Sequence, residues 1–225
     1  MSAHIRVLGD RNLDYVSHRE LDAALSLFPG GVSAGWVASD APGAADLRGV
    51  DGLWVAPGSP YRDDDAVLEA LRAAREGGVP VLATCGGFQA AVVELSRNVG
   101  GIAGAAHAET APAAADLVVI KTACSLFGQV RRVQPVAGTR FAAIVGDGAF
   151  DGMHFCSFGA NARYLPRLRE AGLIESAHAP DAGLEAFELR GHPFYFATLF
   201  QPQVGASKSR TLHPLIRAFI ESAIQ

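Results

Sequence analysis

Residues 79–92 read VPVLATCGGFQAAV, and this stretch decides the fold class. The short apolar run before Cys85 is typical of a buried strand, and Gly86–Asn98 has the composition and spacing of a helix. A cysteine at such a junction lies in a tight turn above the carboxyl edge of a sheet, where open α/β sheets bind ligands. The stretch therefore predicts an α/β protein with Cys85 at a ligand-binding edge.

The chain on either side of this stretch alternates between apolar strands and amphipathic helices. This alternation predicts a doubly wound, mostly parallel central sheet with helices on both faces, as in flavodoxin-like folds. Strands are expected at Ile5–Leu8, Val32–Val37, Gly52–Ala56, Pro80–Ala83, Leu184–Leu189 and Tyr195–Leu199. Helices are expected at Arg19–Phe28, Asp63–Glu76, Gly86–Asn98, Leu165–Ala171 and Leu212–Ala223.

The character of the sequence changes after about residue 117. Short β-like segments at Val118–Lys121, Gly128–Pro135 and Phe141–Val145 are separated by turn residues. They predict a small antiparallel β addition to the main sheet. Because neither a linker nor an internal repeat interrupts the chain, we expect a single domain spanning residues 1–225.

Composition excludes several function classes. The 225 residues are 49% hydrophobic and 19% charged, with a net charge of −4, which is typical of a globular protein and argues against nucleic acid as the partner. The sequence has no apolar run of the roughly 20 residues that cross a bilayer, and the first residues do not resemble a signal peptide. The three cysteines, Cys85, Cys124 and Cys156, lack CxxC spacing, which predicts reduced thiols, a cytoplasmic location and no metal site.

The predicted position of Cys85 suits a nucleophile. A helix N-terminus stabilises a thiolate, and the Gly86 N–H is placed to stabilise an oxyanion. A second loop after a buried strand, residues 56–61, should lie beside this turn and offers the Ser59 N–H as the other donor. The plainer alternatives are that Cys85 is a small buried hydrophobe and that the loop is an ordinary Pro-Gly turn.

Six segments, in order along the chain, carry a resemblance to one known family. They are Asp51–Gly58 (DGLWVAPG), Val79–Gln89, Ser96–Val99 (SRNV), Asn161–Leu173, Gly191–Thr198 (GHPFYFAT) and His213–Leu215 (HPL). Their order and spacing resemble those of the glutamine amidotransferase domain of CTP synthase, a class I (triad-type) amidotransferase. The resemblance runs from about residue 4 to residue 222.

The resemblance implies a set of residue roles. In that family a cysteine attacks the side-chain amide of glutamine without a cofactor, and the ammonia passes to a synthase domain. Cys85 matches the nucleophile, and Ser59 and Gly86 match the oxyanion-hole positions. The resemblance places substrate-binding residues at Gly58, Gln89, Glu109, Ser157 and Phe158, and a carboxylate at Glu109 suits an ammonium group.

Three departures from the family pattern affect the chemistry. Gln201 stands where the family has its catalytic histidine, and Gln203 stands where it has the glutamate that orients the histidine. Ser157 replaces the arginine that grips the α-carboxylate of glutamine. A glutamine amide cannot accept and return a proton at neutral pH, and loss of the base in hydrolytic triads costs about 10³ to 10⁶ in rate.

These departures leave three functions open. One is a repurposed cysteine enzyme that acts on an amide, ester or thioester of an amine-bearing small molecule other than glutamine. His107 or His154 would then be the candidate alternative base, and Cys156, if it lies in the pocket, would be a second thiol able to resolve a thioester or to be oxidised with Cys85. The others are a binding or scaffolding pseudoenzyme, and a weak glutaminase that supplies ammonia to a separate synthase chain. A homodimer is also left open.

Overall fold

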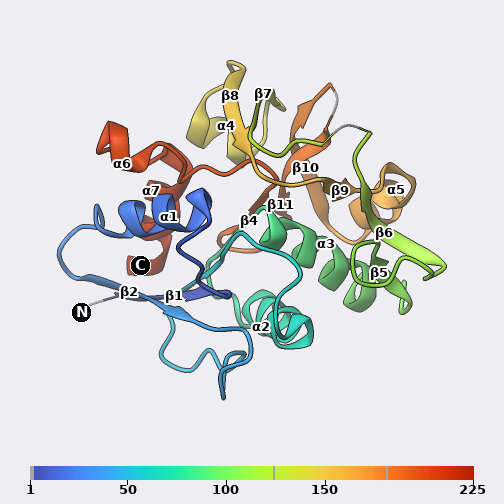
Figure 1. The fold of residues 1–225 in the computed structure, drawn as a ribbon, viewed down its shortest axis with the longest axis horizontal. Helices are drawn as coiled ribbons and strands as arrows, with labels where there is room; N and C mark the ends of the chain where they lie inside the picture. The colour runs from blue at the N-terminus through green and yellow to red at the C-terminus, as the bar shows by residue number, and fades with distance from the viewer. Residues whose placement is uncertain (1–2, 124, 181) are drawn as a thin grey trace.

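A nine-stranded mixed sheet forms the centre of the protein, in a computed structural model that describes residues 3–123, 125–180 and 182–225 (Figure 1). Its strands run parallel from β2 to β12 and antiparallel from β12 to β8. In spatial order they are β2 (Val32–Val37), β1 (Ala3–Leu8), β3 (Gly52–Val55), β4 (Val81–Thr84), β12 (Tyr195–Thr198), β11 (Gly183–Leu189), β10 (Leu173–Ala179), β7 (Gln129–Pro135) and β8 (Phe150–His154).

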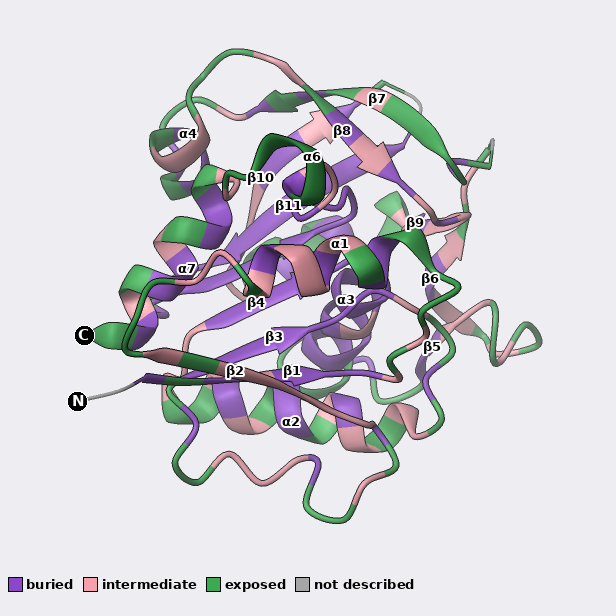
Figure 2. Ribbon diagram, turned by 60° about the vertical axis from the view of Figure 1, so that its left-hand side comes forward, coloured by how far each residue is buried: buried purple, intermediate pink, exposed green. Residues whose placement is uncertain are grey.

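Helices cover both faces of this sheet because its central strands are buried on both sides. Along β3, Leu53 and Val55 belong to one apolar cluster, whereas Trp54 between them belongs to the other. Figure 2 shows the purple, buried strands between the two helical layers. The first cluster includes α2 (Asp64–Gly77), α3 (Gly86–Asn98) and α5 (Leu165–Glu170), and the second includes α1 (Val16–Leu25), α4 (Arg140–Val145) and α7 (Pro214–Ile224).

A second, three-stranded sheet lies next to α3. It consists of β5 (Ala105–His107), β6 (Asp116–Lys121) and β9 (Phe158–Ala160), with β6 parallel to β5 and antiparallel to β9. This sheet brings His107 and Phe158 beside the first turn of α3. The predicted α/β class, with an additional small sheet, is confirmed.

The structure corrects one predicted element and adds several short ones. Phe141–Val145, expected to be β-like, lies in helix α4. The reason is tertiary: the buried Glu188 carboxylate of β11 accepts hydrogen bonds from the backbone N–H groups of Arg140 (3.1 Å) and Phe141 (2.9 Å), which stabilises the helix N-terminus. The sequence reading missed β5, β8, β9, β10, the 3₁₀ turn η1 (Ala162–Tyr164) and α6 (Ala206–Ser209).

The described helices are also informative about membranes. None of those within residues 3–123, 125–180 and 182–225 is both long and apolar enough to cross a bilayer.

Removal of the Glu188 carboxylate should destabilise the fold. We expect Glu188→Ala to lower the free energy of unfolding by about 1–3 kcal/mol, because it leaves buried donors at the start of α4 without their acceptor. Urea denaturation followed by circular dichroism measures this loss. Glu221→Ala, at an exposed position of α7, is the matched control and should change the stability little. Equal stability of the two variants would contradict the assignment.

Candidate active site

Cys85 occupies a strained turn between β4 and α3. Its φ of 55° and ψ of −106° place a non-glycine residue in the left-handed half of conformational space, and among the described non-glycine residues only Arg210 also has a positive φ. The turn is held on both sides, because the Cys85 N–H donates to Thr198 of β12 (2.8 Å) and its carbonyl accepts from Gln89 (3.1 Å). A strained residue of this kind at a strand-to-helix turn is typical of a nucleophile.

Two glycines after the cysteine allow a neighbouring loop to approach closely. A Cβ atom on Gly86 would lie 2.1 Å from the carbonyl oxygen of Gly58, and one on Gly87 would lie 2.6 Å from the carbonyl oxygen of Val55. Both clashes are with backbone atoms. The first turn of α3 therefore requires glycine at both positions, and the loop that follows β3 packs directly against the turn that holds Cys85.

A buried histidine that the sequence reading missed holds this loop. The Nε2 of His18, in α1, donates to the carbonyl oxygen of Pro57 (2.8 Å), while its Nδ1 accepts from the Asn12 N–H (2.9 Å). Burial lowers the pKa of His18, so the ring stays neutral in the tautomer that this arrangement requires. The Tyr61 hydroxyl donates to the Ala56 carbonyl (2.6 Å) at the other end of the loop. His18 is a positioning residue, and a lone histidine in a helix had no sequence signal for this role.

The surroundings of Cys85 favour its thiolate. The Cys156 thiol donates to the Cys85 sulfur and is the main cause of the lowered pKa of Cys85. Burial acts in the opposite direction, and the N–H groups of Gly86 and Gly58 add to the lowering. The pKa of Cys156 is raised well above its ordinary value by the same contact, by burial and by Glu185. The pair therefore consists of one thiolate-prone sulfur and one thiol that keeps its proton.

The two glutamines at the predicted triad positions are bonded to each other. The Gln203 Nε2 donates to the Gln201 Oε1 (2.9 Å), and both side chains are buried. The Gln201 Nε2 makes no hydrogen bond of standard geometry among the described residues, although this amide contributes to the lowered pKa of Cys85. Gln201 therefore presents N–H groups toward the sulfur, where they stabilise negative charge but cannot remove a proton.

Neither candidate alternative histidine offers a free ring nitrogen. His107 donates from Nε2 to the Gln89 Oε1 (3.0 Å) and accepts at Nδ1 from the Glu109 N–H (3.0 Å), and burial lowers its pKa to about 4. His154 is fully buried, with Nδ1 bonded to the Gly152 carbonyl (3.0 Å) and Nε2 to the Glu185 carboxylate (2.9 Å). The expectation that one of them serves as the base is not supported by this geometry.

A cavity of about 550 Å³ opens at Cys85 and gathers most of the predicted site residues. Glu109 lies at its rim, where its Oε2 accepts from the Ser59 hydroxyl (3.0 Å). The Nε2 of Gln89 donates to the Phe158 carbonyl (2.9 Å), so Gln89 connects α3 to β9. Predicted residues that line the cavity are Gly58, Ser59, Cys85, Gln89, Glu109, Cys156, Ser157, Phe158 and Gln201, and residues not predicted are Asp14, Tyr15, Val16, Ser17, Pro57, Phe127 and Phe155.

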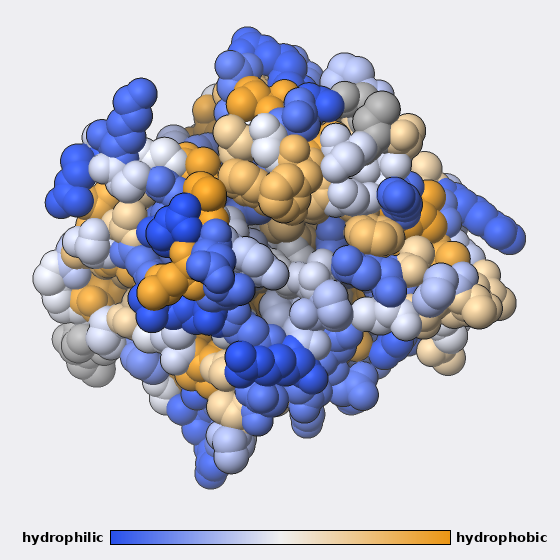
Figure 3. Space-filling view, in the orientation of Figure 1, coloured by the Kyte–Doolittle hydropathy of each residue, from blue (hydrophilic) through white to orange (hydrophobic). Residues whose placement is uncertain are grey.

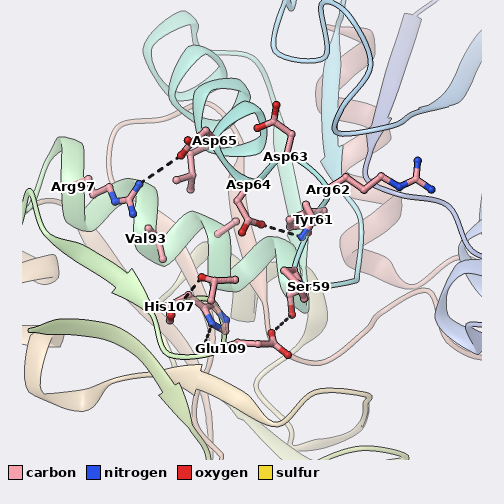
Figure 4. A pocket seen from close by; sticks show the side chains of 15 residues that line it. Ser59, Tyr61, Arg62, Asp63, Asp64, Asp65, Val93, Arg97, His107 and Glu109 are labelled. Atoms are coloured by element: carbon pink, nitrogen blue, oxygen red, sulfur yellow. Dashed lines mark hydrogen bonds and ion pairs between the residues drawn. The ribbon is translucent and has the colours of Figure 1, made fainter. Parts of the chain in front are cut away.

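A second cavity of about 390 Å³ shares Ser59 and Glu109 with the first, and Figure 4 shows its lining side chains and the Ser59–Glu109 hydrogen bond. Gly86 and His107 line this cavity rather than the first one. Of the remaining predicted residues, Gln203 lies behind Gln201, and His154 lies in the core. Cys124, the third cysteine of the sequence, falls outside the described residues.

Comparisons with known proteins agree with this geometry. The chain matches the Peptidase C26 family over residues 56–203. It is 36% identical over 191 residues to a CTP synthase from Rubrobacter xylanophilus and 33% identical over 213 residues to one from Acidiphilium cryptum. These matches cover 79% and 84% of the chain, but only 34% and 39% of the relatives.

The fold has a counterpart among solved structures. The glutaminase domain of Trypanosoma brucei CTPS with bound acivicin superimposes with a TM-score of 0.86, covering 99% of this chain and 94% of that chain at 24% sequence identity. The cysteine at the strand-to-helix turn, the mixed sheet and the family match lead to one conclusion. The chain belongs to the Peptidase C26 family and has the fold of a class I glutamine amidotransferase domain of the CTP synthase type.

Proposed function

We propose that the protein is a cysteine-dependent enzyme that transfers or hydrolyses an acyl group of an amine-bearing small molecule other than glutamine. The observation that carries this proposal is the environment of Cys85. A strained turn, two backbone N–H groups and the Cys156 thiol favour the thiolate, although no histidine faces it among the described lining residues. The arrangement supports nucleophilic attack without a general base.

The chemistry would proceed through an acyl-enzyme. The Cys85 thiolate attacks the carbonyl carbon of the substrate, a carbon–sulfur bond forms, and the carbonyl oxygen becomes an oxyanion. The N–H groups of Gly86 and Gly58, which face the sulfur, are the nearest donors for that oxyanion. The bond to the leaving group then breaks, and water or a second nucleophile releases the acyl group and regenerates the thiolate.

The lack of an imidazole restricts the leaving group. An amine leaves only after it is protonated, whereas a thiolate departs without a proton at neutral pH. Because the pKa of Cys156 is raised, its thiol is a poor acid for this step. Thioesters and activated esters are therefore better substrates for this site than primary amides. The reaction needs Cys85 reduced, which agrees with the predicted cytoplasmic location.

A specific observation favours a second candidate function. The Gln203–Gln201 pair fills the triad positions with groups that cannot exchange protons, which suits a binding or scaffolding pseudoenzyme that keeps the pocket. The enzyme requires the Cys85 thiol for its activity, whereas the pseudoenzyme does not. In a pseudoenzyme, Cys85→Ser would bind its ligand or partner as the natural protein does.

Acyl transfer to Cys85 is the direct test. We expect the S-phenyl thioester of β-alanine to form a covalent adduct on Cys85, detected by mass spectrometry of the intact protein and its peptides. Cys85→Ala should form no adduct, and Cys156→Ser should retain it. Failure of Cys85 to react, in a protein that is folded by circular dichroism, would leave the pseudoenzyme as the better description.

The pH dependence of alkylation tests the role of Cys156. We expect Cys85 to react with iodoacetamide with a pH midpoint below the ordinary value of a thiol, because its lowered pKa makes the thiolate available at lower pH. Cys156→Ala should shift the midpoint upward by about one pH unit, which is about tenfold less thiolate below it. Cys156→Ser, which keeps a hydroxyl donor at this position, is the control and should shift the pH midpoint of alkylation less. Identical pH profiles in all three proteins would refute the role.

Glutamine hydrolysis tests the glutaminase alternative, in which ammonia would pass to a separate synthase chain. We expect glutamate release by the natural protein to be slow, and the Gln201→His/Gln203→Glu variant to release it about 10² times faster or more, because it regains a general base. Gln203→Glu alone should give no gain, and Cys85→Ala in the double variant should abolish release. If the natural protein releases glutamate as fast as the double variant, it is a glutaminase.

A further inference from the structure

The cavity at Cys85 has an unbalanced charge. Asp14 and Glu109 both line it, and the described lining residues include no lysine, arginine or histidine. Glu109 keeps its carboxylate exposed at the rim, with one oxygen bonded to the Ser59 hydroxyl. Such a cavity attracts a cationic group and repels a carboxylate.

The mouth of the same cavity is apolar. Three large hydrophobic side chains that line it are exposed: Phe127 by 67%, Tyr15 by 51% and Val16 by 41%. Phe127 contacts Phe155 edge to face, with ring centroids 5.6 Å apart. Figure 3 shows apolar surface, in orange and tan, along one side of a hollow near the middle of this face. Exposed rings that converge on a cavity are typical of a ligand-binding surface.

The wall between these rings and the sulfur is neutral. The Ser157 and Ser125 hydroxyl groups lie 3.1 Å apart and bond to each other, and the Ser125 hydroxyl also accepts from the Phe127 N–H (3.3 Å). The two hydroxyl groups therefore have partners within the protein. A carboxylate on the ligand would find no positive charge on this wall, while an aryl or alkyl group would find the Phe127 ring beside it.

We infer that the substrate is an amine that lacks a carboxylate beside its amino group and carries an aryl or alkyl group there instead. The ammonium would bind at Glu109, the apolar group would pack on Phe127 and Phe155, and the reacting carbonyl would lie at Cys85. This inference rests on the proposed function for its reaction and names the chemical class of the substrate. The faces of the Phe127 and Phe155 rings also attract a nearby cation.

Binding by three related amides tests the class of ligand. Glutamine, γ-aminobutyramide (glutamine without its carboxylate) and the derivative of γ-aminobutyramide with a benzyl group on the amine-bearing carbon differ only at that carbon. Calorimetric titration uses Cys85→Ala, which cannot form an acyl-enzyme. We expect γ-aminobutyramide to bind about tenfold more tightly than glutamine, and the benzyl derivative about tenfold more tightly again.

Variants assign each preference to its residue. Phe127→Ala, in the Cys85→Ala background, should remove the higher affinity for the benzyl derivative. The affinity for γ-aminobutyramide should stay within twofold of its value without the Phe127 substitution. Phe127→Leu, which stays apolar, should keep most of the higher affinity for the benzyl derivative. Glu109→Gln should weaken the binding of γ-aminobutyramide and of its benzyl derivative about tenfold, since it removes the charge without changing the shape of the side chain. Val130→Ala, at an exposed apolar position that does not line the cavity, is the control and should change nothing.

The outcome separates this inference from the proposed function. Binding of glutamine as tight as that of the benzyl derivative, or binding of none of the three amides, would overturn the inference even if Cys85 still accepts an acyl group from a thioester. Conversely, the three amides could bind in the expected order to a protein whose Cys85 never forms an adduct with a thioester. That result would support the inferred class of ligand and refute the proposed enzymatic function.

Discussion

The left-handed backbone of Cys85 is the constraint on which the rest of the site depends. A side chain in that conformation is costly, and it persists because hydrogen bonds from β12 and α3 hold the residue on both sides. The turn lifts the sulfur to the carboxyl edge of the sheet and points the first N–H of α3 toward it. It also brings Gly86 so close to the Gly58 carbonyl that a side chain there would clash. Cys85, the loop after β3 and helix α3 are therefore positioned as one unit.

Around this unit the described side chains offer hydrogen-bond donors to the sulfur rather than a proton acceptor. The paired amides of Gln201 and Gln203 are inert to protons, and both nitrogens of His107 and of His154 are already bonded. What faces the sulfur is a set of donors, of which the Cys156 thiol is the strongest influence. Donors lower the pKa of a thiol, but they cannot take a proton from water or return one to an amine. This difference separates the chemistry open to the site from that of a triad.

The loops before α1, after β5, before β7 and between β8 and β9 line the cavity and determine what it admits. They contribute carboxylates and aromatic rings from parts of the chain more than a hundred residues apart, including Tyr15 and Phe127. Because such loops vary independently of the sheet and of the turn at Cys85, a scaffold of this kind can accommodate different ligands without a change in the core. His18 connects α1 to the loop beside the sulfur, because it belongs to α1 and donates a hydrogen bond to the Pro57 carbonyl of that loop.

The sequence by itself determined the α/β class, the parallel strands, the helix Gly86–Asn98 and the position of Cys85 at its start, because these depend on local periodicity and on glycines next to a buried strand. That Gln201 and Gln203 stand in place of ionisable triad groups is a prediction from the family resemblance. Only the tertiary structure shows that a glutamate 47 residues away accepts from the Phe141 N–H and stabilises the start of α4, which Thr139 caps. Likewise, the contact of Cys156 with Cys85, the support from His18 and the acidic, aromatic lining of the cavity depend on which distant segments meet, and no local pattern encodes that.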